Sequence, residues 1–145
     1  MSPLYTAFSA LMLISCFYAM IAGRRDGRIA VALLVSATLL TWLALGMDHY
    51  RFVVGAIDAA LLVGLAVLSM RTRHYWPLWL AGMHCAGMAA HIVTQLNPDL
   101  PGKLYQAIIA FWSIPMQVIL VIGILMDRRA ARHAERLAPD GGSAP

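Results

Sequence analysis

Five apolar runs separated by short polar segments restrict the fold of this chain more than any other feature of its sequence. These runs are residues 3–22, 29–46, 52–70, 76–96 and 104–126. Each contains about 18 to 23 residues, enough for a helix to cross a hydrocarbon layer roughly 30 Å thick. Because the connections are short, consecutive helices must be antiparallel neighbours. The pattern predicts an all-α integral membrane protein built as a five-helix transmembrane up-down bundle.

The composition supports residence in a membrane. Hydrophobic residues make up 61% of the 145 residues and charged residues 12%, whereas a soluble domain carries roughly 25% charged residues. So few charges cannot cover the surface of a globule in water. The net charge of +4 fits basic cytoplasmic loops better than nucleic-acid binding. The expected partner is therefore the lipid bilayer, with no nucleic acid.

The distribution of basic residues predicts the orientation of the bundle. An N-terminus outside the membrane puts nine of the eleven Lys and Arg residues on inner segments and leaves only Arg51 and Lys103 outside. The nine are Arg24, Arg25, Arg28, Arg71, Arg73, Arg128, Arg129, Arg132 and Arg136. Basic residues concentrate on the cytoplasmic side of membrane proteins. The count therefore predicts an N-terminus outside and a C-terminus inside.

The chain divides into two regions. Residues 1–126 form the predicted transmembrane domain, and residues 127–145 form a cytoplasmic basic helix followed by a disordered tail. Arginine and aromatic side chains at the inner ends of the runs are expected to anchor the topology at the lipid headgroups. These anchors are Arg24, Arg25, Arg71, Arg73, Trp76, Trp79, Arg128 and Arg129.

Asp58 is the one acidic residue within the apolar runs. An ionised acid at the centre of a bilayer costs around 3 kcal/mol, so it normally faces the bundle interior and has a partner. Folding the chain about residue 73 brings Asp58 level with residue 88 or 89, which makes His91 the candidate partner. One interpretation is a proton or cation relay. The other is a structural hydrogen bond that locks the third helix to the fourth.

Polar residues form stripes on the last two runs. His84, Met88, His91 and Gln95 are spaced four, three and four residues apart, so they share one helix face. The fifth run repeats this spacing. Together with Asp58, the stripes predict an intramembrane polar seam. Its members are Asp58, His84, His91, Gln95, Gln106, Ser113 and Gln117.

The two histidines of the fourth run also raise the question of a metal or haem. Seven helical residues separate His84 from His91 by about 10 Å along the helix axis, so they cannot both be axial ligands of one haem. Thioether and imidazole suit copper(I), which leaves Met88 with His84 or His91 as a lesser hypothesis. Cys16 and Cys85 form no CxxC motif. No cofactor is expected.

Several short segments carry a family resemblance. They are Ile57–Leu62, Arg73–Trp79, His91 and Trp112–Pro115. In these the chain resembles a group of small uncharacterised multi-pass inner-membrane proteins of alphaproteobacteria. The resemblance implies a bacterial inner membrane and no catalytic activity. His84 falls where this group leads us to expect an apolar or amide residue, so Asp58 and His91 rank above His84 as functional candidates.

Three hypotheses for the function follow. The chain contains no phosphate-binding loop, nucleophile elbow or HExxH motif, so we expect no enzyme. Small residues four apart, such as Gly82 and Ala86, allow close helix contacts. They favour a non-enzymatic accessory, interaction or assembly subunit of a membrane complex, which binds another membrane protein or a second copy. The alternative is a small transporter or proton relay that uses Asp58 and His91. A membrane metal or haem protein is the third.

Overall fold

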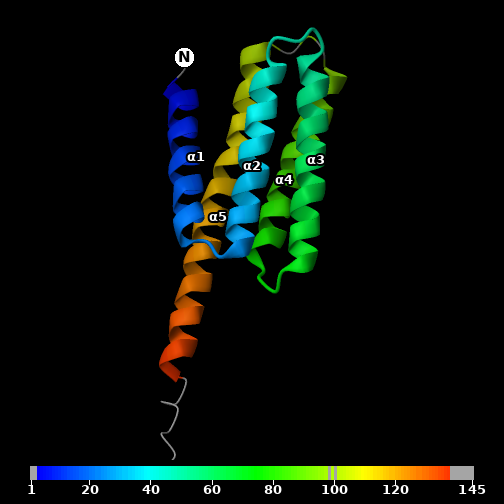
Figure 1. Cartoon of the computed structure of the whole chain (residues 1–145). Helices are drawn as coiled ribbons and strands as arrows, with labels where there is room; N and C mark the ends of the chain where they lie inside the picture. Colours follow the sequence, from blue (N-terminus) through cyan, green and yellow to red (C-terminus); the bar gives the residue numbers. More distant parts are fainter. Residues whose placement is uncertain (1–2, 98, 100, 138–145) are drawn as a thin grey trace, which may run out of the picture.

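The computed structural model describes residues 3–97, 99 and 101–137, without the side chains of residues 3–8, 105, 106, 109 and 110. This part of the chain is helical and contains no strand (Figure 1). The helices are α1 (Pro3–Ala22), α2 (Arg25–Ala44), α3 (Tyr50–Arg71), α4 (Trp76–Leu96) and α5 (Gly102–Leu137). The first and fourth helices have the bounds of the predicted runs. The second begins before its run and also ends before it, the third extends slightly beyond its run at both ends, and the fifth continues into polar sequence.

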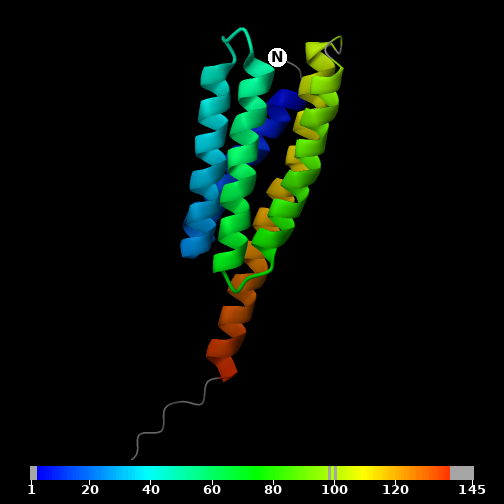
Figure 2. The same ribbon diagram turned by 90° about the vertical axis from the view of Figure 1, so that its right-hand side faces the viewer.

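The helices run up and down in sequence order and close into a ring. α3 packs against α2 and α4, and α5 packs against α4 and α1, while α1 also contacts α2. Figures 1 and 2 show the same order from two sides. Short connections explain this order, since two residues between α1 and α2 leave no room for a crossing. The core contains Leu65, Leu80 and Leu120, all fully buried.

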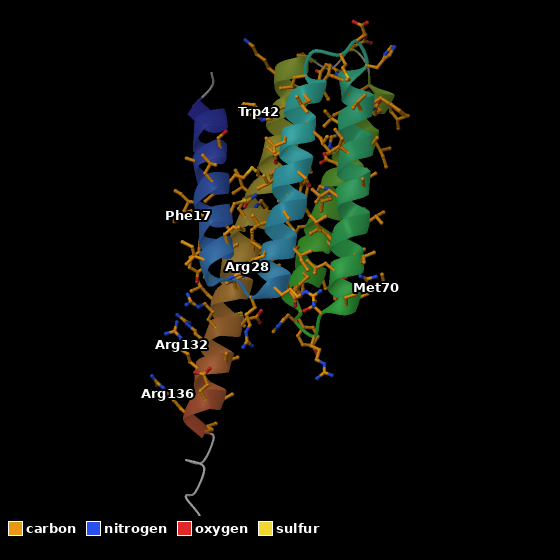
Figure 3. The ribbon with its side chains drawn as sticks, viewed as in Figure 1. Phe17, Arg28, Trp42, Met70, Arg132 and Arg136 are labelled. Atoms are coloured by element: carbon orange, nitrogen blue, oxygen red, sulfur yellow. The ribbon has the colours of Figure 1, made fainter. Side chains whose placement is uncertain are left out.

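The outside of the ring is apolar. Each helix exposes at least one large hydrophobic side chain, namely Phe17, Trp42, Phe52, Trp79 and Phe111 from α1 to α5. Figure 3 shows Phe17 on the outer side of α1. Patches of this extent are rare on soluble monomers and mark surfaces that face lipid or protein.

Three segments of the described chain are long and apolar enough to cross a membrane. They are Arg25–Ala44, Tyr50–Arg71 and Phe111–Leu137. α4, which carries His84 and His91, is not among them, and the searched part of α1, Ser9–Ala22, is a shorter apolar helix. These lengths and compositions are those of a membrane protein.

One end of the bundle collects the arginines. The connections at residues 23–24 and 72–75 lie at this end, and α5 continues past it (Figure 1). Figure 3 shows Arg28, Arg132 and Arg136 there. We call it the arginine-rich end. Arg51 and Lys103 start the helices at the opposite end.

α5 is one helix of 36 residues that contains Pro115 in its interior. Its C-terminal part extends alone beyond the other helices (Figures 1 and 2). The predicted basic helix from residue 127 is therefore the continuation of the fifth helix rather than a separate element. The predicted disordered tail lies within residues 138–145, which are outside the described part.

Trp76, one of the predicted lipid anchors, is buried between helices. Its side chain packs against Gly123 of α5, and only 6% of the residue is exposed. The indole Nε1 donates a hydrogen bond to Oδ2 of Asp127 at 2.8 Å. Because Gly123 has no side chain, the ring fits between the helices. Trp76 thus joins α4 to α5, whereas Trp79 is 67% exposed.

Candidate functional site

Asp58 lies in the middle of α3 and faces α4. Its Oδ2 atom is 2.6 Å from Nε2 of His91. His91 is buried and Asp58 is nearly so. When the carboxyl group is ionised it only accepts hydrogen bonds, so the imidazole Nε2–H is the donor. This is the pairing that matched depth in two neighbouring helices predicts.

His84 contacts the main chain of Asp58, whereas His91 contacts its side chain. Its Nε2 atom is 2.9 Å from the main-chain oxygen of Asp58. A carbonyl oxygen accepts and never donates, which places the ring proton of His84 on Nε2. Two buried histidines of α4, two helical turns apart, thus both contact one residue of α3. We call Asp58, His84 and His91 the Asp58 node.

The histidines and Gly87 divide the inner surface of α4 between two neighbours. Gly87 lies between His84 and His91 in sequence and is buried. A Cβ atom placed on Gly87 would be 3.6 Å from Cβ of Trp112 on α5. α4 therefore offers hydrogen bonds to α3 and a close backbone approach to α5. Interhelical hydrogen bonds in membranes contribute about 0.6 kcal/mol on average, and up to roughly 2 kcal/mol.

The other predicted seam residues are arranged differently. Gln95 is exposed at the end of α4, with its amide nitrogen beside Gly55, so it does not extend the node inward. Gln117 is only 3% exposed, and its Oε1 accepts no hydrogen bond within the described part of the chain. Ser113 is half-buried and has a polar interaction of its own. The side chain of Gln106 lies outside the described residues.

Metal ligands do not gather in this region. Across the described residues, no group of three or more His, Cys, Asp and Glu side chains is arranged to hold a metal ion. Met88 is half-buried on α4. The Nε2 atoms of His84 and His91, the outer atoms of both rings, are engaged by Asp58.

A second polar cluster, which the sequence reasoning missed, lies at the arginine-rich end. Oδ1 of Asp127 is 2.9 Å from Nδ1 of His74, while its Oδ2 accepts from Trp76. Thr72 donates to Oδ2 of Asp26 at 2.6 Å, which ties the end of α3 to the start of α2. In sequence these acids look like ordinary loop charges beside arginines. Only the folded structure, which brings Asp127 to His74 and Trp76 and brings Asp26 to Thr72, distinguishes these acids from loop charges.

Comparison of the chain with protein-family models, with curated proteins and with solved structures finds no match.

Proposed function

We propose that the chain is a multi-pass protein of a bacterial inner membrane, with all five helices crossing the bilayer. The N-terminus lies outside and the C-terminus inside. Support comes from the apolar side chains exposed on every helix. The arginines at one end of the bundle support the orientation, since basic residues favour the cytoplasmic side.

In this membrane we propose that the protein is a non-enzymatic accessory or assembly subunit of a complex. The observation that carries this proposal is the pair of contacts from His84 and His91 of α4 to Asp58 of α3. The carboxylate and the carbonyl oxygen of Asp58 both bind histidines of α4. These contacts hold α3 against α4, which gives the bundle a defined outer surface.

The outer surface of α4 suits a partner helix. Gly82, Cys85 and Ala89 are exposed on this helix, where small side chains allow another backbone to approach closely. Beside Gly82 lies an apolar hollow of about 240 Å³. Its other lining residues are Leu78, Trp79 and Met83. We propose that another membrane protein, or a second copy, packs on this face.

A proton relay is the second candidate. The 2.6 Å contact between Asp58 and His91 favours it, because ionisable pairs within membrane spans often carry protons. In a relay both side chains must exchange partners during each cycle. In a subunit they need only hold α3 against α4.

Two sets of variants separate these functions. Asp58→Asn and His91→Ala should lower the thermal stability of the protein in detergent, by about 0.6 to 2 kcal/mol for each lost hydrogen bond. Recovery of the partner protein or of the dimer should persist. Gly82→Leu, which fills the exposed face, should abolish that association and leave the melting temperature nearly unchanged.

A measurement of proton flux tests the proton-relay hypothesis directly. The purified protein is reconstituted in vesicles that contain a pH-sensitive dye, with Asp48→Asn as the control for loss of an exposed acid. We expect no flux above empty vesicles. Flux that Asp58→Asn abolishes and Asp48→Asn preserves would establish the relay instead.

A further inference from the structure

A cavity of about 240 Å³ opens at the arginine-rich end. It lies between the connection of α1 to α2 and the part of α5 that leaves the bundle. The apolar wall includes Ala22, Trp76 and Ile124, all buried. Arg132, labelled in Figure 3, belongs to the opposite, polar wall on the projecting part of α5.

Three arginines line this cavity without partners of their own. Arg24 comes from the connection, and Arg128 and Arg132 come from α5. Within the described part of the chain the ion pairs are those of His74 with Asp127 and of His91 with Asp58, so none of the three arginines is paired. Guanidinium groups bind phosphate oxygens through charge-assisted hydrogen bonds. The unpaired cations therefore favour a phosphate group.

The acids of the cavity are placed differently. Both oxygens of Asp127 are occupied, by His74 and by Trp76. Asp26 accepts from Thr72 through one oxygen, and Glu135 is exposed near the mouth without a hydrogen bond to the described residues. Asp26 and Glu135 thus offer carboxylate oxygens to a cation. A ligand that carries both a phosphate and an amine can bind the arginines through its phosphate and the carboxylates through its ammonium group.

We propose that this cavity binds the headgroup of an amine-bearing phospholipid, such as phosphatidylethanolamine. The phosphodiester binds Arg24, Arg128 and Arg132, and the ammonium group lies between Asp26 and Glu135. The cavity is at the end of the spans, which is the level of the headgroups, and pockets of this kind between membrane helices bind lipid headgroups. The apolar wall of Ile124 and Trp76 accommodates the glycerol and the first methylenes.

A soluble phosphate ester shares the phosphate chemistry but lacks acyl chains. The lipid is the better occupant because the cavity adjoins an apolar outer surface, where Ile21 and Leu125 are exposed. The first turn of α2 begins without a side-chain cap, and Asp26 and Gly27 of this turn line the cavity.

The test uses the full-length protein in mild detergent and native mass spectrometry. Phosphatidylethanolamine and phosphatidylglycerol with the same acyl chains are added in equal amounts. We expect one phosphatidylethanolamine per chain to be retained in preference to phosphatidylglycerol. The double variant Arg24→Gln/Arg132→Gln should bind it at least about tenfold more weakly, since hydrogen bonds to charged groups are lost.

The control double variant is Arg129→Gln/Arg136→Gln. It removes the same charge from the same end of the molecule, but neither residue lines the cavity. It should retain the lipid as the wild type does. Equal loss in both double variants would show general attraction to basic residues and overturn the proposal. Preference for phosphatidylglycerol would overturn it too.

Glu135→Gln keeps the test decisive if the first double variant does not fold. Glu135 is exposed, so this change should not disturb folding. It should abolish the preference for phosphatidylethanolamine while total lipid binding persists. An unchanged preference would contradict the amine site.

A competition experiment tests whether a soluble phosphate ester could be the ligand instead. Inorganic phosphate and phosphoethanolamine are titrated against bound lipid. Displacement of the lipid by inorganic phosphate at equal concentration would overturn the lipid assignment.

Discussion

Gly123 shows how one absent side chain organises an end of the bundle. A Cβ atom at this position would overlap Cβ and Cγ of Trp76. Gly123→Ala should therefore displace the indole, weaken its hydrogen bond to Asp127 and lower stability by about 1–3 kcal/mol, the usual range for overpacking. The readout is thermal unfolding in detergent, followed by the fluorescence of the protein.

Gly82→Ala is the matched control, because a Cβ atom on Gly82 meets nothing within 4 Å. It should leave stability unchanged or raise it slightly, since alanine restricts the unfolded chain. Equal melting temperatures for the two alanine variants would show that Trp76 does not pack on α5 as described.

The identity and position of single residues predict some of the contacts and not others. The pairing of Asp58 with His91 could be predicted, since a membrane acid needs a partner and depth selects one. The bond from His84 to the carbonyl oxygen of Asp58 could not, because every residue carries a carbonyl group. The position of Trp76 beside the arginines is typical of an interfacial residue, so the sequence predicts a lipid anchor and gives no sign of the contact with Gly123.

The helices themselves allow a test of the packing of α4 on α5. A Cβ atom on Gly87 would lie 3.6 Å from Cβ of Trp112, which is within the range that a disulfide bridges. In a background of Cys16→Ala and Cys85→Ala, the pair Gly87→Cys/Trp112→Cys should oxidise to a disulfide. Intact mass spectrometry after alkylation should find neither cysteine alkylated, because both are held in the disulfide.

The pair Gly82→Cys/Trp112→Cys in the same background controls for random oxidation. A Cβ atom on Gly82 meets nothing within 4 Å, so both cysteines of this pair should stay reduced and be alkylated. If this control pair oxidised as completely as the pair at 87 and 112, α4 would be rotated relative to the structure.

Helix bounds followed from the apolar runs, except where polar sequence continues a helix. α2 begins at Arg25 and α5 ends at Leu137, both beyond the apolar segments. Hydropathy detects where a helix enters lipid, whereas helix propensity allows it to continue into water. The sequence around Asp127 contains mostly alanine and arginine, which are good helix formers.

For the whole molecule, the orientation in the membrane is the next prediction to test. Single cysteines replace Lys103 or Arg136 in a background without Cys16 and Cys85, and intact bacterial cells are treated with a membrane-impermeant thiol reagent. The cysteine at position 103 should react from outside. The cysteine at position 136 should react only after the membrane is permeabilised. The reverse pattern would invert the proposed topology.

The sequence by itself determined the helical class, the approximate helix bounds, the gathering of arginines at one end and the partner of Asp58. Each of these depends on local composition or on depth along antiparallel helices, both of which can be read along the chain. The tertiary structure decided the closure of the ring between α1 and α5, the contact of His84, the burial of Trp76 against Gly123 and the charged cavity. Those features depend on how each helix is rotated about its axis and on which distant residues converge, and a one-dimensional pattern does not contain that information.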